Sequence, residues 1–256
     1  MIRIEHISKS FNGRSIIKDI SATFETGKTS LIIGTSGSGK TVTLKTIVGL
    51  IQADGGNIFY DDINFTQLDI HGRKAIRQQI GMLFQGSALF DSMTVEENVI
   101  FPLNMFTSMT MKEKLNRVNF CLERVNLPNS NKLLPNELSG GMKKRVGIAR
   151  AIVMNPKYLF CDEPNSGLDP KTSLVIDKLI SDITKEYNIT TVVNTHDMNS
   201  VMEIGNYILF LFNGEKRWEG TNKEILDSTD VELDNFIFAS EFMKEMKAIS
   251  HMEKKT

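Results

Sequence analysis

The sequence predicts an α/β fold with a mostly parallel sheet core, an N-terminal antiparallel β subdomain and an inserted helical subdomain. Short apolar runs rich in β-formers alternate with helical patterns, as in a parallel sheet covered by helices. The stretch 94–154 is mostly helical and interrupts that alternation. The chain has 256 residues, of which 41% are hydrophobic and 24% charged, enough for one large domain.

The strand and helix patterns place the elements in order. The first two strands are predicted to pair antiparallel around an Asn12-Gly13 turn. The glycine pair Gly55-Gly56 is predicted to stop the first helix. The predicted strands are residues 2–6, 16–24, 29–33, 56–60, 80–84, 158–161, 190–194 and 207–212. The clearest predicted helices are residues 40–50, 111–125 and 139–154.

This order predicts one domain over residues 1–230, with a helical subdomain at about residues 86–155 inserted in its core. Residues 231–256 are predicted to form a C-terminal helical tail. Its apolar side chains recur at helical spacing, at Phe236, Ala239, Met243 and Met246. Such a helix either packs on its own domain or clasps a second copy of the chain, and the sequence leaves both open.

Charge and composition narrow the functional class. Thirty Lys and Arg against 31 Asp and Glu give a formal net charge of -1, so the overall basic footprint of a nucleic-acid-coating protein is missing and we expect no nucleic-acid partner. No stretch approaches the roughly 18 to 20 apolar residues of a membrane-spanning helix, and the first residues do not resemble a signal peptide. Cys121 and Cys161 form neither a disulfide framework nor a metal-binding spacing, so we expect two reduced, buried thiols.

The strongest local motif is a glycine-rich loop between a predicted strand and a predicted helix. It reads Gly34-Thr35-Ser36-Gly37-Ser38-Gly39-Lys40-Thr41 and fits the phosphate-binding pattern G-x-x-x-x-G-K-[ST]. Glycines let backbone N–H groups curl around phosphate oxygens, and the following helix directs its positive end at the same anion. Lys40 is predicted to reach the β- and γ-phosphates, and the Thr41 hydroxyl to bind Mg²⁺.

A phosphate-binding loop alone does not separate kinases, GTPases and motors, but a second set of motifs does. The acidic pair Asp162-Glu163 ends an apolar strand, and Thr195-His196-Asp197 ends the next one. The remaining motifs are Leu138-Ser139-Gly140-Gly141-Met142 and Ser166-Gly167-Leu168-Asp169. In this order and combination the chain resembles the nucleotide-binding subunit of an ABC transporter, from about residue 2 to residue 226. In that family two chains sandwich two ATP molecules head to tail.

The resemblance implies a role for each residue at the active site. Asp162 is placed to hold Mg²⁺, and Glu163 to polarise the attacking water as a general base. His196 resembles the switch histidine that contacts the γ-phosphate. Gln85 resembles the glutamine that senses Mg²⁺ and water, and Phe11 resembles the aromatic side chain that stacks on adenine.

The signature motif is expected to act on a second copy of the chain. Ser139, Gly140 and Gly141 open a helix, where a hydroxyl and backbone N–H groups meet a phosphate. By resemblance that phosphate belongs to ATP bound by the other chain, and Asp169 links the two active sites. Hydrolysis of ATP with Mg²⁺ then requires a symmetric homodimer.

The cargo is indicated by resemblance alone. Residues 83–103, LFQGSALFDSMTVEENVIFPL, are similar to ATPases of the Mla type, which work with MCE-domain proteins in bacterial lipid transport. Met142 replaces the glutamine of most importers and fits that branch. The implied partners are an integral-membrane permease that docks near residues 85–103 and an MCE-type lipid-binding protein. The implied cargo is a lipid, with phospholipid as the expected class, and the implied location is the cytoplasmic face of the bacterial inner membrane.

Other readings share most of these motifs. The ATPase of a conventional solute importer or of a lipoprotein-release system would have the same catalytic residues and differ in partner and cargo. A soluble non-transport ABC ATPase generally has two ATPase halves in one chain or a long coiled-coil insertion. This sequence has one phosphate-binding loop, one LSGG and no sustained heptad run. The interpretation as an inactive, purely structural ABC-like subunit is disfavoured by the presence of Lys40, Asp162, Glu163 and His196.

Overall fold

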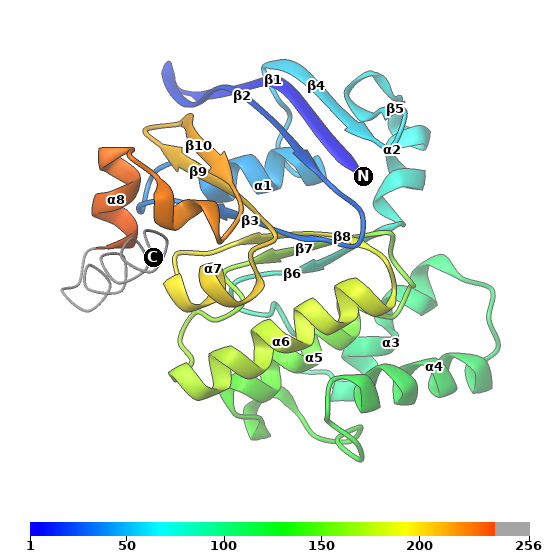
Figure 1. Cartoon of the computed structure of the whole chain (residues 1–256). Helices are drawn as coiled ribbons and strands as arrows, with labels where there is room; N and C mark the ends of the chain where they lie inside the picture. Colours follow the sequence, from blue (N-terminus) through cyan, green and yellow to red (C-terminus); the bar gives the residue numbers. More distant parts are fainter. Residues whose placement is uncertain (239–256) are drawn as a thin grey trace.

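The computed structural model describes residues 1–238 and contains two sheets with helices between and below them (Figure 1). One sheet has the strand order β2-β1-β4-β5 and the other the order β10-β9-β3-β8-β7-β6. The strands are β1 (Ile2–Phe11), β2 (Arg14–Phe24), β3 (Thr29–Ile33), β4 (Gly55–Tyr60), β5 (Ile63–Asn64), β6 (Ile80–Leu83), β7 (Tyr158–Asp162), β8 (Thr190–Asn194), β9 (Tyr207–Phe212) and β10 (Glu215–Gly220). The α-helices are α1 (Lys40–Val48), α2 (Ile70–Arg77), α3 (Val95–Phe106), α4 (Met111–Arg124), α5 (Gly140–Ile152), α6 (Pro170–Glu186), α7 (Met198–Ile204) and α8 (Val231–Ile237).

The six-stranded sheet is parallel except at one edge, as the alternating sequence pattern predicts. Strand β3 pairs in parallel with β8 and β9, and β7 pairs in parallel with β6 and β8. Only β10 runs antiparallel, next to β9 at the edge of the sheet. The predicted antiparallel pairing of the first two strands is also confirmed, with Ile2 opposite Phe24. The predicted fold class is therefore confirmed.

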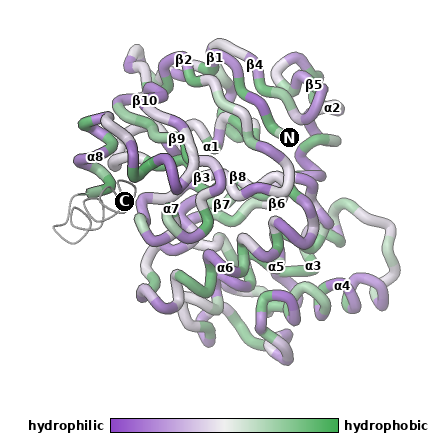
Figure 2. Tube along the Cα trace, in the orientation of Figure 1, coloured by the Kyte–Doolittle hydropathy of each residue, from purple (hydrophilic) through white to green (hydrophobic). Residues whose placement is uncertain are grey.

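The hydrophobic core lies on both faces of the six-stranded sheet. On one face, α1 packs between this sheet and the antiparallel sheet, with Leu44 and Ile47 fully buried. On the other face, helices α3 to α6 bury apolar side chains such as Val146 and Ile180 against the strands. Figure 2 shows hydrophobic and hydrophilic residues alternating along α4, which fits a helix with one buried face. The sheet is covered on both sides, so its inner strands are buried, and β7 (YLFCD) and β3 (TSLII) are buried along their whole length.

Two boundaries differ from the sequence prediction. The first helix, predicted over residues 40–50, ends at Val48, and its stop is Gly49 rather than the Gly55-Gly56 pair. Gly49 adopts a left-handed conformation (φ 78°), and its N–H returns to the carbonyls of Lys45 and Thr46. Gly55 instead begins β4. The first strand is also longer than residues 2–6, since an irregularity at His6 (φ 50°) lets pairing resume and continue to Phe11.

The predicted helical subdomain corresponds to α3, α4 and α5, which all lie between β6 and β7 in the chain. Both α3 and α4 begin with capping boxes, at Thr94 with Glu97 and at Thr110 with Glu113. In Figure 1 these helices lie together with α6 in the layer below the six-stranded sheet. No helix within residues 1–238 is long and apolar enough to cross a membrane.

The predicted tail begins with α8, which packs on its own domain. The ring of Phe236 stacks on Phe210 of β9 with centroids 5.5 Å apart, and Leu233 and Ile237 are buried. The predicted positions Ala239, Met243 and Met246 lie outside the described residues. The choice between a tail that clasps a second copy and one that stays on its own domain therefore remains a prediction.

Candidate nucleotide-binding and hydrolysis site

Four strands of the parallel sheet end at the same edge, and the predicted site residues follow them. Residues 34–41 follow β3, Gln85 follows β6, Glu163 follows β7, and His196 follows β8. Loops at the carboxyl edge of a parallel sheet are where α/β proteins bind their ligands. The sheet topology thus collects residues that are far apart in the sequence.

The glycine-rich loop forms the connection between β3 and α1 and packs closely on its neighbours. A Cβ at Gly34 (φ 148°) would lie 2.2 Å from the carbonyl oxygen of Leu211, so this position tolerates no side chain. Gly39 is the N-cap of α1 and provides no side-chain cap, which leaves the first N–H groups of the helix available to an anion. The Lys40 Nζ donates to the carbonyls of Gly34 and Thr35 at 2.8 and 3.1 Å. The loop therefore has the geometry of a phosphate cradle with an ammonium group across it.

The Lys40 ammonium lies in a partly buried, acid-lined environment. Burial lowers the pKa of Lys40 from its ordinary value, and the charges of Glu163 and Asp162 oppose this shift. A buried ammonium is stabilised by nearby negative charge, which phosphate groups also provide. This electrostatic balance favours an anionic ligand at the loop.

Polar side chains from three separate segments meet behind the loop. The Thr41 Oγ1 lies 3.4 Å from the Asp162 Oδ1. The Asn194 amide donates to both, at 2.6 Å to the Asp162 Oδ1 and 3.1 Å to the Thr41 Oγ1. Asn194 is fully buried at the end of β8. Sequence reasoning missed Asn194, although a polar residue that ends an apolar strand just before His196 is a usable signal.

These residues fit a magnesium ion bound together with phosphates. Hydroxyl and carboxylate oxygens are the donors that Mg²⁺ prefers, and it usually binds through one or two carboxylates plus phosphate oxygens. The Asn194 Oδ1 is buried and has no hydrogen-bond partner within the described chain. No cluster of three or more His, Cys, Asp or Glu side chains that could hold a metal ion is present in residues 1–238.

Asp162 and Glu163 are adjacent in sequence but face different partners. Glu163 adopts a left-handed backbone conformation (φ 51°). Its Oε2 lies 2.7 Å from the Nδ1 of His196. The Glu163 side chain is 12% exposed and the His196 side chain 66% exposed. They line one wall of a cavity of about 420 Å³ that also includes Ser166 and Thr195. A carboxylate that is held by a histidine and faces a cavity has the geometry of a general base.

Two predicted residues sit at the margin of the site. Gln85 lies in the loop after β6 and is exposed, and its side chain forms no hydrogen bond to Thr41 or Asp162 within residues 1–238. Phe11 is the last residue of β1 rather than a residue after the strand, and it is 44% exposed. The Lys9 ammonium lies 5.3 Å from its ring centroid. An exposed ring at a strand end is available for stacking on a planar ligand.

The signature residues lie in a different layer from the glycine-rich loop. Ser139 caps α5 by accepting from the Met142 N–H at 3.3 Å, and Gly140 and Gly141 form the first turn. Helix α5 lies below the six-stranded sheet, whereas α1 lies above it (Figure 1). A Cβ at Gly141 would lie 2.6 Å from the Thr172 side chain. The structure thus does not bring Ser139 onto the glycine-rich loop of the same chain.

Asp169 has a structural task that the sequence did not reveal. Its carboxylate caps α6 by accepting from the backbone and hydroxyl groups of Thr172 at 3.0 and 2.5 Å. These hydrogen bonds hold the pKa of Asp169 below its usual range. Because Thr172 packs on Gly141, the N-termini of α5 and α6 lie side by side.

Comparison with known proteins identifies the family. The family model described as "ABC transporter" matches residues 17–166, which is more than half of the chain. The chain belongs to the ABC transporter family. The matched residues include the glycine-rich loop, the signature motif and the acidic pair. The chain is an ABC transporter ATPase subunit that binds ATP with Mg²⁺.

Curated relatives of this ABC subunit differ in cargo. The chain is 34% identical over 236 residues to the "Probable ribonucleotide transport ATP-binding protein mkl" of Mycobacterium tuberculosis, covering 92% of this chain and 66% of that protein. It thus spans just under two thirds of that relative's length. It is 36% identical over 261 residues to the "Methionine import ATP-binding protein MetN" of Campylobacter jejuni, covering 96% of this chain and 78% of that protein.

Solved structures confirm the fold. The dimeric ABC transporter cassette MJ0796, described as bacterial, matches with a TM-score of 0.80 and 33% identity, covering 87% of this chain and 99% of that chain. A second MJ0796 structure is a dimer in a post-hydrolysis state bound to ADP and phosphate. The cbiO1 protein from Clostridium perfringens, part of a transporter complex, matches with a TM-score of 0.82 and 26% identity over 98% of both chains.

Proposed function

We propose that this ABC ATPase subunit powers lipid transport, with a separate membrane permease and an MCE-type lipid-binding protein as partners. The permease would hold it at the cytoplasmic face of a bacterial inner membrane, and the expected cargo is a phospholipid. The observation that carries the proposal is an apolar groove lined by the segment 83–103, whose sequence resembles Mla-type ATPases.

The hydrolytic chemistry follows from the positions of the site residues. The N–H groups at the start of α1 and the Lys40 ammonium bind and orient the ATP phosphates. Thr41 and Asp162 would hold Mg²⁺, which neutralises charge that develops on the phosphates. Glu163 accepts a proton from the attacking water through its carboxylate, and His196 orients that carboxylate through their 2.7 Å contact.

The ATP site requires two copies of the chain. The signature residue Ser139 and the loop residue Lys40 lie on opposite sides of the six-stranded sheet. A head-to-tail pair would place Ser139 of one copy against ATP on the loop of the other, which supports a symmetric homodimer.

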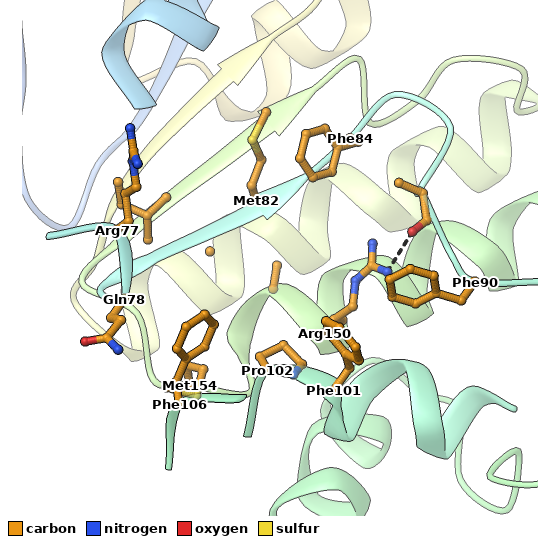
Figure 3. Close-up of a pocket in the computed structure, with 14 residues that line it drawn as sticks. Arg77, Gln78, Met82, Phe84, Phe90, Phe101, Pro102, Phe106, Arg150 and Met154 are labelled. Atoms are coloured by element: carbon orange, nitrogen blue, oxygen red, sulfur yellow. Dashed lines mark hydrogen bonds between the residues drawn. The ribbon is translucent and has the colours of Figure 1, made fainter. Parts of the chain in front are cut away.

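The groove lies between β6 and the helices α3 and α5, with a volume of about 450 Å³ (Figure 3). Aromatic rings from separate elements face it, and those of Phe90 and Phe101 have centroids 5.0 Å apart. Phe90 and Phe106 remain exposed. The lining residues that Figure 3 labels are Arg77, Gln78, Met82, Phe84, Phe90, Phe101, Pro102, Phe106, Arg150 and Met154. An apolar, open groove of this kind accepts the apolar face of a helix, as a permease segment would present.

The groove is connected to the hydrolytic site through one loop. Phe84 lines the groove, and the next residue is Gln85. The Arg150 guanidinium, on α5, donates to the carbonyls of Ser87 and Ala88 at 2.5 and 2.7 Å. A helix seated in the groove would therefore press on the loop that carries Gln85. This connection supports a coupling path between the permease and ATP hydrolysis.

A conventional solute importer is the second candidate. The relatives described as methionine importers favour it, since one of them is 36% identical over almost the whole chain. The two candidates share the hydrolytic residues and differ in partner and cargo. The Met142 side chain, which replaces glutamine in the signature, packs against the core of the helical layer and gives no direct information on cargo.

The deciding experiment identifies the partners. The tagged chain is expressed in its native cell, membranes are solubilised gently, and co-purifying proteins and lipids are identified by mass spectrometry. The proposal predicts a permease, an MCE-domain protein and enriched phospholipid. A Phe101→Asp variant should lose the permease and retain ATP binding in calorimetry, because it places a charge in the groove and leaves the glycine-rich loop intact.

The possible outcomes separate the candidates. A permease with a solute-binding protein and no enriched lipid would assign the chain to a conventional importer. A chain recovered only from the soluble fraction would favour a non-transport ABC ATPase. An unchanged permease yield with Phe101→Asp would remove the groove as the docking site.

A further inference from the structure

The backbone of Glu163 is held in a conformation that its side chain disfavours. Its φ of 51° lies in the left-handed region, where residues other than glycine, asparagine and aspartate are uncommon. Such a conformation persists only where surrounding contacts determine it. One contact is the Glu163 N–H, which donates to the Asn194 carbonyl at 2.8 Å. The orientation of the Glu163 carboxylate therefore depends on the groups that hold this backbone.

Lys144 of α5 holds the other end of the same residue. Its Nζ donates to the Glu163 carbonyl at 3.1 Å and also to the Gln85 carbonyl. Lys144 is 5% exposed, so its ammonium has left bulk water. Burial lowers its pKa, and Cys161, Glu163 and Asp162 oppose that shift. A buried ammonium requires acceptors, and here the two backbone carbonyls provide them.

The position of Lys144 connects three functional segments. It lies five residues after Ser139 on the helix that the signature motif begins, about 7 Å along its axis. Its two acceptors belong to the loop after β6 and the loop after β7. The next residue, Arg145, instead donates to the Asn126 carbonyl at 2.9 Å, inside the helical layer. Arg150 of the same helix donates to Ser87 and Ala88 in the loop after β6, whereas the Lys144 side chain joins the loops after β6 and β7 to each other.

We propose that Lys144 is a positioning residue for ATP hydrolysis, which fixes Glu163 and the Gln85 loop relative to the signature helix. The contact sets the direction of the Glu163 carboxylate, because it constrains the carbonyl of a residue whose N–H is already held by Asn194. When Ser139 engages ATP of the second copy, the shift of α5 reaches Glu163 through this ammonium. The inference rests on the role of Glu163 as general base.

The test compares kcat and KM for steady-state ATP hydrolysis between the purified full-length chain and its variants. Lys144→Met removes the ammonium but keeps a long, buried side chain, and it should lower kcat at least tenfold. The KM for ATP and the ATP affinity from calorimetry should stay within twofold, since Lys144 does not touch the glycine-rich loop. Lys144→Arg should retain kcat within about threefold, because a guanidinium can also donate to two carbonyls. The control is Lys143→Met, at a more exposed position of the same helix.

A double-mutant cycle separates positioning from general stabilisation. In the Glu163→Gln background, Lys144→Met should cause little further loss of kcat, because the carboxylate that it positions is already gone. If Lys144→Met does not fold, as judged by thermal unfolding, Lys144→Gln replaces it. The shorter amide reaches one carbonyl and should give an intermediate loss.

Three results would overturn the proposal. An unchanged kcat in Lys144→Met means that the bridge does not matter for hydrolysis. Equal losses in Lys144→Met and Lys144→Arg, with KM and thermal stability altered together, mean that Lys144 only supports the fold. A full additional loss in the Glu163→Gln background means that Lys144 acts independently of Glu163. A normal kcat in Glu163→Gln alone would overturn the general-base role itself, and this result is read from a separate single variant.

Discussion

The buried carboxylate of Asp177 makes the stability of this protein depend on pH. It lies on α6 with 1% of the residue exposed, and accepts from the Asn165 amide at 2.9 Å and the Ser200 hydroxyl at 2.8 Å. Burial raises the pKa of Asp177 from 3.8 to about 6 against these hydrogen bonds, and the charges of Asp197 and Glu203 add to the increase. The carboxylate thus binds a proton more tightly in the folded chain than in the unfolded chain.

The sign and size of the effect follow from linkage. Because the folded pKa is the higher one, the unfolded chain loses this proton first as pH rises, and folded stability decreases between about pH 4 and pH 6. A change from 3.8 to about 6 corresponds to about 3 kcal/mol in all. When the titrations of the folded and unfolded chains are both included, Asp177 contributes about 1.3 kcal/mol less to the free energy of unfolding at about pH 7 than at about pH 5.

Asp177→Asn removes this titration and almost preserves the side-chain shape. Urea unfolding, followed by the fluorescence of Trp218, gives the free energy of unfolding of both proteins at pH 5, 6 and 7. The wild-type value minus the variant value should be about 1.3 kcal/mol higher at about pH 5 than at pH 7. Asp182→Asn, which removes an exposed carboxylate of the same helix, controls for the change in net charge. A difference that stays constant across this range would refute the reasoning.

Three further predictions concern ATP and Mg²⁺. Glu163→Gln should preserve ATP binding and lower turnover at least tenfold, about 1.4 kcal/mol in the barrier, in a steady-state phosphate-release assay; near-normal turnover would exclude it as the base. Lys40→Ala should abolish ATP binding in calorimetry, because the charge on the β- and γ-phosphates is lost; undiminished affinity would contradict the loop assignment. Asn194→Val removes the donor to Asp162 and Thr41 and should raise several-fold the Mg²⁺ concentration that gives half-maximal ATP affinity. An unchanged Mg²⁺ titration would show that Asn194 does not support Mg²⁺ binding.

Much of the architecture was predictable because the sheet is buried on both faces. The parallel strands β3, β7, β8 and β9 read as short apolar runs, which are easy to recognise. The edge strand β10, with the polar sequence EKRWEG, has no such signal and was not predicted. The end of α1 was misplaced, because Gly49 and Gly55 both look like helix stops and only the left-handed conformation of Gly49 decides between them.

The sequence by itself was enough to predict which residues would contact phosphate. In residues 34–41 and 138–142, the required chemistry is carried by neighbouring backbone groups, so a contiguous pattern reveals it. The acidic pair and His196 could be recognised from the sequence for a similar reason, since each lies at the end of an apolar strand. These patterns, together with the resemblance, were enough to predict an ATPase and the family.

Only the tertiary structure decided which side chains complete the site. Asp162 and Thr41 are separated by 121 residues, and Asn194 joins them only because β8 lies beside β7 and β3 in the sheet. The bond from Lys144 to Glu163 depends on how α5 crosses those strands and on a left-handed backbone that no propensity indicates. Such contacts arise from packing between distant segments, and a local sequence pattern carries no information about that packing.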